Sequence, residues 1–147
     1  MLEAPLSTSS PAPSTSPIVS KTKSKKNNAR FLLLKSPRGD WNFVKGHREK
    51  KETDYETLKR EIFEETGINY YDIVSYLGKI NYKFKRNGSQ VKKEIKFYYA
   101  NTYRNKVILS KEHVDYAWLE YYQAKRLLTF YESKLILEKV FKSGLSY

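Results

Sequence analysis

The sequence contains no cysteine, and its 147 residues include only two histidines, His47 and His113. The absence of cysteine excludes disulfide scaffolds, thiol nucleophiles, thiol redox motifs and cysteine-based zinc sites. Two histidines are too few for a histidine-rich metal cage. Hydrophobic residues make up 39% of the chain, and no run approaches the roughly 20 apolar residues of a membrane-spanning helix. The N-terminal segment also lacks the basic and apolar regions of a secretory signal. We therefore expect a cytoplasmic protein with no membrane segment and a single domain.

Acidic residues are outnumbered, since 28 lysines and arginines stand against 16 aspartates and glutamates and the net charge is +12. Residues 1–29 contribute +3, from four lysines against one glutamate, and the remainder contributes +9. A basic body favours polyanionic partners such as nucleotides, polyphosphates or nucleic acid. Solubility alone is the alternative explanation of the charge. The 13 tyrosines suit either base stacking or ordinary packing.

The N-terminal segment differs in composition from the rest, because 12 of its first 20 residues are Ser, Thr or Pro. So few apolar side chains cannot offset the entropy lost on ordering, and we predict that residues 1–17 are disordered. Residues 18–28 are ambiguous, with Pro17–Ser20 either a short edge strand or part of the tail. We therefore expect a tail over 1–28, serving as a tether, an anion-binding arm or an inert extension, and one globular domain over 29–147.

Patterns of apolar and polar residues predict an α/β fold. Strands are expected from continuous or alternating apolar residues, helices from 3.6-residue periodicity, and a hairpin from Asn87-Gly88. The helix at residues 53–66 is the clearest, because Thr53 and Glu56 form a capping box and Gly67 suits a helix end. The expected elements are a buried strand at 29–36, a structured loop at 41–52, two long strands around 80–84 and 95–99, a short strand at 116–120 and a helix at 122–141.

Three carboxylates fall on one stripe of the predicted helix at 53–66, namely those of Glu61, Glu64 and Glu65. Like charges three or four residues apart repel each other, so this stripe calls for a compensating cation. Arg60 is a sequence neighbour, but the helical wheel directs it to another side. Mg²⁺ or Mn²⁺ is the better candidate, because hard divalent ions prefer carboxylate oxygens. The alternative is a solvated acidic face.

A longer motif surrounds this stripe, because residues 46–68 read GHREKKETDYETLKREIFEETGI. This segment resembles the Nudix box, whose pattern is G, five residues, E, seven residues, R-E-apolar-x-E-E-x-G-apolar. All nine specified positions match without a gap. The length of the motif makes a chance match negligible.

The Nudix resemblance implies an α/β/α sandwich around a mixed sheet, and metal-dependent hydrolysis of a nucleoside diphosphate linked to another group. It implies that Glu61, Glu64 and Glu65 bind the metal together with the Gly46 carbonyl. It also implies that Glu52 and Arg60 pair to brace the loop on the helix as structural support. Metal in such a site neutralises phosphate charge and lowers the pKa of a bound water.

Two flanking segments narrow the resemblance to the bis(5′-nucleosyl)-tetraphosphatase branch of the family. Residues 39–47, GDWNFVKGH, are similar to the branch segment G-x-W-x-F-P-K-G-H, with Val44 in place of proline. This likeness implies that Lys45 is a phosphate ligand. Residues 109–119, LSKEHVDYAWL, resemble S-x-E-H-x-x-y-x-W-L. That likeness implies that Glu112 is an auxiliary metal ligand or a base, and that His113 is structural or close to phosphate.

Four further residues are candidates for holding the substrate. Tyr82, Phe130 and Tyr131 occupy positions where the branch places groups that stack on adenine, and core packing is the alternative for each. Lys93 matches a phosphate-contacting lysine of the branch.

The sequence supports three functional hypotheses. The first is a hydrolase that uses Mg²⁺ or Mn²⁺ to split dinucleoside polyphosphates, chiefly diadenosine tetraphosphate, into ATP and AMP. The second is removal of pyrophosphate or a cap from RNA 5′ ends, which the basic surface would suit. The third is a non-catalytic nucleotide- or RNA-binding module, against which the intact glutamate set argues. The oligomeric state stays open.

Overall fold

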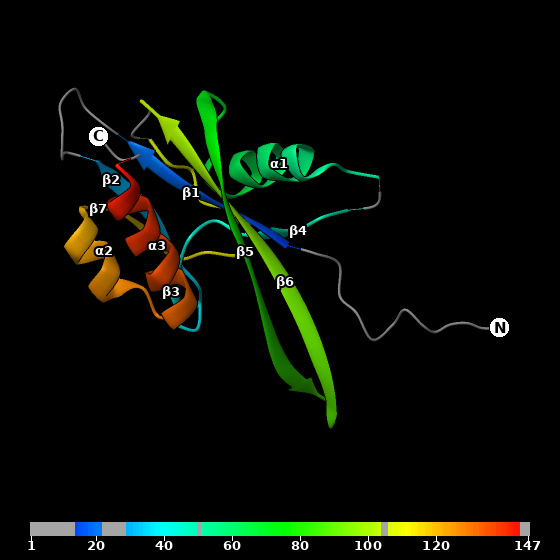
Figure 1. Ribbon diagram of the computed structural model, residues 1–147. Helices are drawn as coiled ribbons and strands as arrows, with labels where there is room; N and C mark the ends of the chain where they lie inside the picture. The colour runs from blue at the N-terminus through cyan, green and yellow to red at the C-terminus, as the bar shows by residue number, and fades with distance from the viewer. Residues whose placement is uncertain (1–13, 22–28, 50, 104–105, 145–147) are drawn as a thin grey trace.

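The computed structural model describes residues 14–21, 29–49, 51–103 and 106–144, apart from the side chain of Tyr82. Seven strands and three helices form within these residues (Figure 1). The strands are β1 (Ser14–Lys21), β2 (Arg30–Lys35), β3 (Trp41–Asn42), β4 (Gly46–His47), β5 (Tyr71–Arg86), β6 (Ser89–Thr102) and β7 (Asp115–Leu119). The helices are α1 (Asp54–Thr66), α2 (Tyr121–Leu127) and α3 (Tyr131–Ser143).

The strands form one mixed sheet in the order β3-β2-β1-β6-β5, with β4 paired to β1 and β7 paired to β2. The centre of the sheet is β1, which runs parallel to β6 from Ser14↔Ile95 to Lys21↔Thr102 and antiparallel to β2 and β4. β5 and β6 form a long antiparallel hairpin. The mixture of parallel and antiparallel pairs confirms the predicted sheet type.

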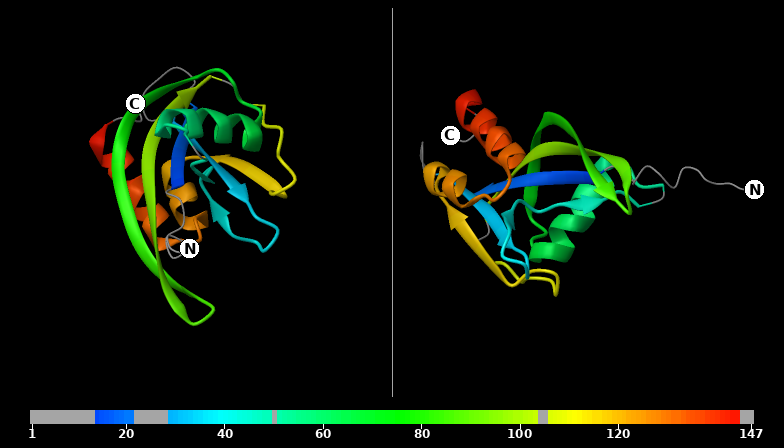
Figure 2. Two further views of the ribbon diagram at one scale, coloured as in Figure 1. Left: turned by 90° about the vertical axis from the view of Figure 1, so that its right-hand side faces the viewer. Right: turned by 90° about the horizontal axis from the view of Figure 1, so that it is seen from below.

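Helices cover both faces of this sheet, with α1 on one side and α2 and α3 on the other (Figure 2). Alternation along the strands explains this arrangement, because successive side chains point to opposite faces. In β1, Ile18 packs in the core under α2 and α3, whereas Val19 packs in the core under α1 with Ile62. The predicted α/β/α sandwich is therefore confirmed. None of the three helices in the described part of the chain has the length and apolarity needed to cross a bilayer.

The predicted disorder is wrong for residues 14–17, because Ser14–Lys21 form strand β1, buried at every position. Of the two alternatives for Pro17–Ser20 the strand is correct, but it is central in the sheet and not at its edge. The polar side chains that suggested disorder find partners inside the fold. Ser16 Oγ donates to the Val44 carbonyl at 2.7 Å, and the hydroxyls of Ser20 and Tyr99 share a hydrogen bond of 2.6 Å. Ladders to β2 and β6 on either side supply the main-chain bonds. The folded domain thus includes residue 14, whereas residues 1–13 and 22–28 lie outside the described residues.

Several local predictions are confirmed. Helix α1 carries the full capping box, in which Thr53 Oγ1 accepts from the Glu56 amide and Glu56 accepts from the Thr53 amide. Gly67 ends the helix in the left-handed conformation with φ 72°. The hairpin turns at Asn87-Gly88, where both residues have positive φ, as a two-residue turn of this type requires.

The single helix predicted at 122–141 is wrong, because α2 and α3 are separated by extended residues at Leu128–Phe130. The break coincides with two hydrogen bonds between Thr129 and Trp41 of β3, which is far away in the sequence. The Thr129 amide donates to the Trp41 carbonyl at 3.0 Å, and Thr129 Oγ1 accepts from the Trp41 amide at 2.9 Å. These bonds to β3 replace helical bonds, and the periodicity of the apolar residues does not reveal them.

Candidate active site

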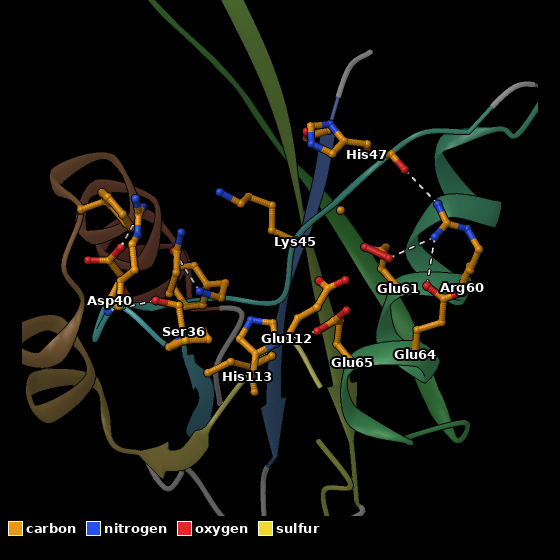
Figure 3. A pocket seen from close by; sticks show the side chains of 18 of the residues that line it. Ser36, Asp40, Lys45, His47, Arg60, Glu61, Glu64, Glu65, Glu112 and His113 are labelled. Atoms are coloured by element: carbon orange, nitrogen blue, oxygen red, sulfur yellow. Dashed lines mark hydrogen bonds and ion pairs between the residues drawn. The ribbon is translucent and has the colours of Figure 1, made fainter. Parts of the chain in front are cut away.

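A cavity of about 660 Å³ lies between α1 and the segments around β3 and β4 (Figure 3). It is lined by all four carboxylates proposed from the sequence for catalysis and metal binding, and by Gly46 and Lys45. The carboxylates come from two places in the sequence, Glu61, Glu64 and Glu65 from α1 and Glu112 from the loop before β7. The fold therefore gathers these candidate residues in one cavity.

Gly46 and Glu61 are in close contact at the wall of this cavity, and both are buried. A Cβ atom added to Gly46 would lie 1.4 Å from Glu61 Oε2. Any larger residue at position 46 would therefore displace the Glu61 carboxylate. The glycine holds this carboxylate against the β4 main chain, beside the carbonyl that the Nudix resemblance assigns to the metal.

Arg60 braces the cavity, and its predicted orientation away from the acidic stripe is wrong. Its guanidinium pairs with Glu52, with Nε 2.7 Å from Oε2 and Nη2 2.9 Å from Oε1. Nη1 also donates to Glu61 at 3.0 Å and to Glu64 at 3.2 Å. The helical wheel fixes where the Cα–Cβ bond points, but the long arginine side chain bends back across the acidic stripe.

The Arg60 network ties the loop to the helix. Nη2 of Arg60 donates to the His47 carbonyl at 2.9 Å, which joins β4 to α1. Hydrogen bonds from Arg60 and from the Glu49 amide lower the pKa of Glu52 to about 2, with help from the Thr57 hydroxyl. Glu52 is thus a stable anion, and the pair holds the main chain around Gly46 on the helix.

The environment of Glu61 disfavours the charged form of its carboxyl. Burial raises the pKa of its carboxyl to about 7, Arg60 opposes this rise, and the nearby charges of Glu65 and Glu64 add to it. One guanidinium therefore does not fully compensate the acidic cluster. A carboxylate in this setting gains from further positive charge in the cavity.

Glu65 and Glu112 are positioned by the segment before β7. Ser110 Oγ donates to Glu65 Oε1 at 2.8 Å, and His113 Nδ1 lies 2.6 Å from the same oxygen at angles outside hydrogen-bond geometry. The Glu112 amide donates to Ser110 Oγ at 3.2 Å. This hydrogen bond positions the main chain of Glu112 in the loop that lines the cavity. The serine and histidine of the S-x-E-H segment thus orient Glu65, while its glutamate faces the cavity.

The donor set of the cavity fits a hard divalent cation, which takes carboxylate and carbonyl oxygens. Among the described residues no three acidic or histidine side chains already converge on one point, and Arg60 contacts two of the carboxylates. The fit follows instead from the contact of Gly46 with Glu61 and from the excess negative charge around Glu61. The groups that would hold the ion are Glu61, Glu64, Glu65, Glu112 and the Gly46 carbonyl.

Two of the proposed substrate residues line the cavity, namely Lys45 and Phe130. Both also line a second cavity of about 340 Å³, whose apolar wall is formed by Ile80, Ile95 and Phe97. Burial lowers the pKa of Lys45, and Asp40 partly restores it. A half-buried lysine between an acidic cavity and one with an apolar wall suits a ligand with a phosphate chain and a flat ring.

Two of the other proposed substrate residues line neither cavity, and the third, Tyr82, is described only by its main chain. Tyr131 is 68% exposed on α3 and lines neither cavity. Lys93 also lines neither cavity, although burial together with the charges of Lys45 and Arg86 lowers its pKa. The main chain of Tyr82 pairs with Lys93, and its side chain lies outside the described residues.

Sequence reasoning missed several residues that line the site. Arg38 and Asn42 line both cavities, and Asn42 Oδ1 accepts from the Phe43 amide and from Ser133 Oγ. Ser14 Oγ lies 3.1 Å from His47 Nδ1 at the first cavity. The turn at Pro37-Arg38-Gly39 next to the predicted phosphate ligand was a usable signal for Arg38. Ser14 had no such signal, because its role depends on the central position of β1.

Comparisons with known proteins agree with this geometry. The NUDIX domain profile matches residues 18–139. The asymmetrical bis(5′-nucleosyl)-tetraphosphatase of Mus musculus is 34% identical over 116 residues, which cover 74% of this chain and 76% of that protein. The enzyme of that name from Sus scrofa is 33% identical over the same shares.

Solved structures share the fold. A C. elegans Ap4A hydrolase binary complex superposes with a TM-score of 0.73 at 25% identity, covering 91% of this chain and 97% of that one. The MutT protein of Methanosarcina mazei Go1 has a TM-score of 0.74 at 20% identity, covering 95% and 98%. With a family profile over most of its length and the box residues gathered at one cavity, this chain belongs to the Nudix hydrolase family.

Proposed function

We propose that this protein is a cytoplasmic, metal-dependent pyrophosphohydrolase that splits diadenosine tetraphosphate and related dinucleoside polyphosphates, releasing ATP and AMP from the tetraphosphate. The observation that carries the proposal is the adjacency of the two cavities. An acidic cavity lined by Glu61, Glu64 and Glu65 shares Lys45 and Phe130 with a smaller cavity that has one apolar wall. The mouse and pig relatives are named for the asymmetrical form of this reaction.

The two cavities suggest that different parts of the substrate bind in different places. The smaller cavity accepts one adenine against its apolar wall, with Phe130 stacking on the ring. Lys45 and Arg38 hold the phosphate chain where the cavities meet. Tyr131 and Lys93 are further candidates for contacts outside the cavities, and Tyr82 remains a candidate for stacking on adenine. The acidic cavity then receives the phosphorus that is attacked. Because the adenine is held at one end, the cut falls a fixed number of phosphates away and is off-centre.

The carboxylates have different roles in metal binding, proton transfer and structural support. Glu61, Glu64 and Glu65 hold Mg²⁺ or Mn²⁺ with the Gly46 carbonyl, and the ion supplies charge neutralisation at phosphate and a more acidic water. Glu112 lines the cavity and takes part in none of the ion pairs among the described residues. It is our candidate for accepting a proton from the attacking water. Glu52 and Arg60 support the loop without touching substrate.

A substrate panel tests the proposal. Purified protein is incubated with diadenosine tetraphosphate, ATP and 5′-triphosphate RNA, each with Mg²⁺, with Mn²⁺ and with EDTA, and the products are separated by chromatography. We expect the dinucleotide to be the best substrate and EDTA to abolish its hydrolysis. Efficient hydrolysis of the RNA with none of the dinucleotide would favour the RNA 5′-end hypothesis. Nucleotide binding without hydrolysis of anything would favour a binding module.

A further inference from the structure

The β5–β6 hairpin extends well beyond the body of the protein (Figure 1). Residues 79–96 of this hairpin contain seven basic residues against one acidic residue, Glu94, and so carry +6 of the net +12. Half of the excess charge thus lies on 18 residues, and none of the seven basic side chains among them lines either cavity described above. Neither the metal site nor the adenine pocket needs charge at this place.

Three of these lysines share one face of the hairpin, and we call them the hairpin lysine patch: Lys83, Lys85 and Lys92. Lys83 lies directly opposite Lys92 across the strands, and Lys85 follows two residues after Lys83. All three side chains are exposed. Like charges directly opposite each other destabilise a strand pair, so this arrangement has a cost in the free protein.

Two other basic residues of the hairpin have acidic partners, whereas the described residues offer none to the patch. Lys79 pairs with Glu94 at 3.3 Å, and Lys96 pairs with Asp54 at 3.0 Å. None of the ion pairs among the described residues includes Lys83, Lys85 or Lys92. The basic charge is thus neutralised near the body and left uncompensated toward the tip. An anionic partner is what the patch lacks.

We propose that the hairpin lysine patch binds the phosphate backbone of a single-stranded nucleic acid. Repeated phosphates match a row of lysines spaced along a strand, and such binding is electrostatic and independent of sequence. Toward the body, the same two strands supply Ile80 and Ile95 to the wall of the smaller cavity. The three lysines lie on the opposite face of the hairpin from these isoleucines, so a strand bound to the patch runs along the outer face of the hairpin and not into that cavity. We favour an unpaired strand because its flexible backbone can bring phosphates to lysines on both strands of the hairpin, Lys83 and Lys85 on β5 and Lys92 on β6.

Counterion release determines how steeply the affinity of the patch for a nucleic acid should fall with salt concentration. Each neutralised phosphate of a single strand contributes about 0.7 to the slope of log affinity against log salt concentration. The three patch lysines account for a slope of about −2.1. Affinity carried by the patch should then fall by roughly 20-fold between 50 and 200 mM salt.

The test uses the full chain and a fluorescent oligouridylate of about 12 nucleotides with a 5′-hydroxyl end, which offers no phosphoanhydride to hydrolyse. Fluorescence anisotropy is measured at several salt concentrations for wild type and for the triple variant Lys83→Gln, Lys85→Gln, Lys92→Gln. The matched control replaces three exposed lysines elsewhere, Lys59, Lys106 and Lys142, by glutamine and has the same net charge. Melting curves verify that both variants fold.

We expect the patch variant to bind at least about tenfold more weakly at 50 mM salt, with a slope reduced by about 2, and the control to stay close to wild type. Hydrolysis of diadenosine tetraphosphate should be equal in all three proteins, because the patch lies outside both cavities. Equal losses in the two variants would overturn the proposal, since net charge alone would then explain binding. Binding of a duplex as tightly as the single strand would overturn the choice of ligand.

Discussion

Replacing Gly46 by alanine should abolish most activity while leaving the fold intact. The added Cβ would lie 1.4 Å from Glu61 Oε2, and ordinary contact begins at 3.4 Å, so this oxygen must move by at least 2 Å. The atom in the way is the end of a flexible side chain, and Gly46 does not have a positive φ. The main chain can therefore stay in place while the carboxylate is displaced.

The expected loss follows from the size of the displacement. A misplacement of about 1 Å at a reacting group costs on the order of 100-fold in rate. We therefore expect kcat/KM to fall by at least about 100-fold, which corresponds to about 2.7 kcal/mol of transition-state stabilisation. The melting temperature should change little, because moving Glu61 toward solvent relieves the burial that raises its pKa to about 7.

A double-mutant cycle isolates the contact between the two residues. Steady-state hydrolysis is measured for wild type, Gly46→Ala, Glu61→Ala and the double variant. If the role of Gly46 is to leave room for the Glu61 carboxylate, the Gly46→Ala substitution should lower the hydrolysis rate only slightly once Glu61 has been shortened to alanine. A loss as large in the Glu61→Ala background as in wild type would refute this reasoning, and so would full activity of Gly46→Ala.

Three further predictions concern the helix, the loop and the central strand. Glu64→Gln and Glu65→Gln should each lower turnover by at least about 100-fold with an unchanged circular dichroism spectrum, because each removes a proposed metal ligand, and wild-type rates in both would remove the metal assignment. Glu52 has a pKa lowered from 4.5 to about 2, so its contribution to stability is present above pH 4.5 and is lost as the pH falls through 2. Glu52→Gln should therefore be less stable than wild type at neutral pH and show a smaller further loss in acid, and parallel melting curves across this range would contradict the prediction. Ile18→Ala should cost about 2 to 5 kcal/mol in urea unfolding, because Ile18 is fully buried in the central strand, and an unchanged midpoint would show that the strand is dispensable.

Local signals in the sequence were enough to predict the helix of the site. The capping box at Thr53 and Glu56 and the glycine at position 67 lie within a few residues of the bonds they make. The same holds for the turn at Asn87-Gly88. Such elements are predictable because the residues that determine them are close together in the chain.

The features that sequence reasoning missed depend on distant partners. Strand β1 is stable because Ser16 and Ser20 bond to Val44 and Tyr99, which no local pattern reveals. The break between α2 and α3 depends on bonds from Thr129 to Trp41. Arg60 reaches Glu61 and Glu64 only because the β4 loop places Glu52 and His47 on its other side.

The products formed from diadenosine tetraphosphate in heavy-oxygen water, separated by chromatography and weighed by mass spectrometry, test the central claim most directly. A substrate held by one adenine, with the attacked phosphorus over the acidic cavity, should give equal amounts of ATP and AMP. The heavy oxygen should appear in only one of the two products, and the reaction should stop when EDTA removes the metal. ADP as the only product would contradict the proposed asymmetric cleavage, and hydrolysis undiminished in EDTA would contradict the metal site.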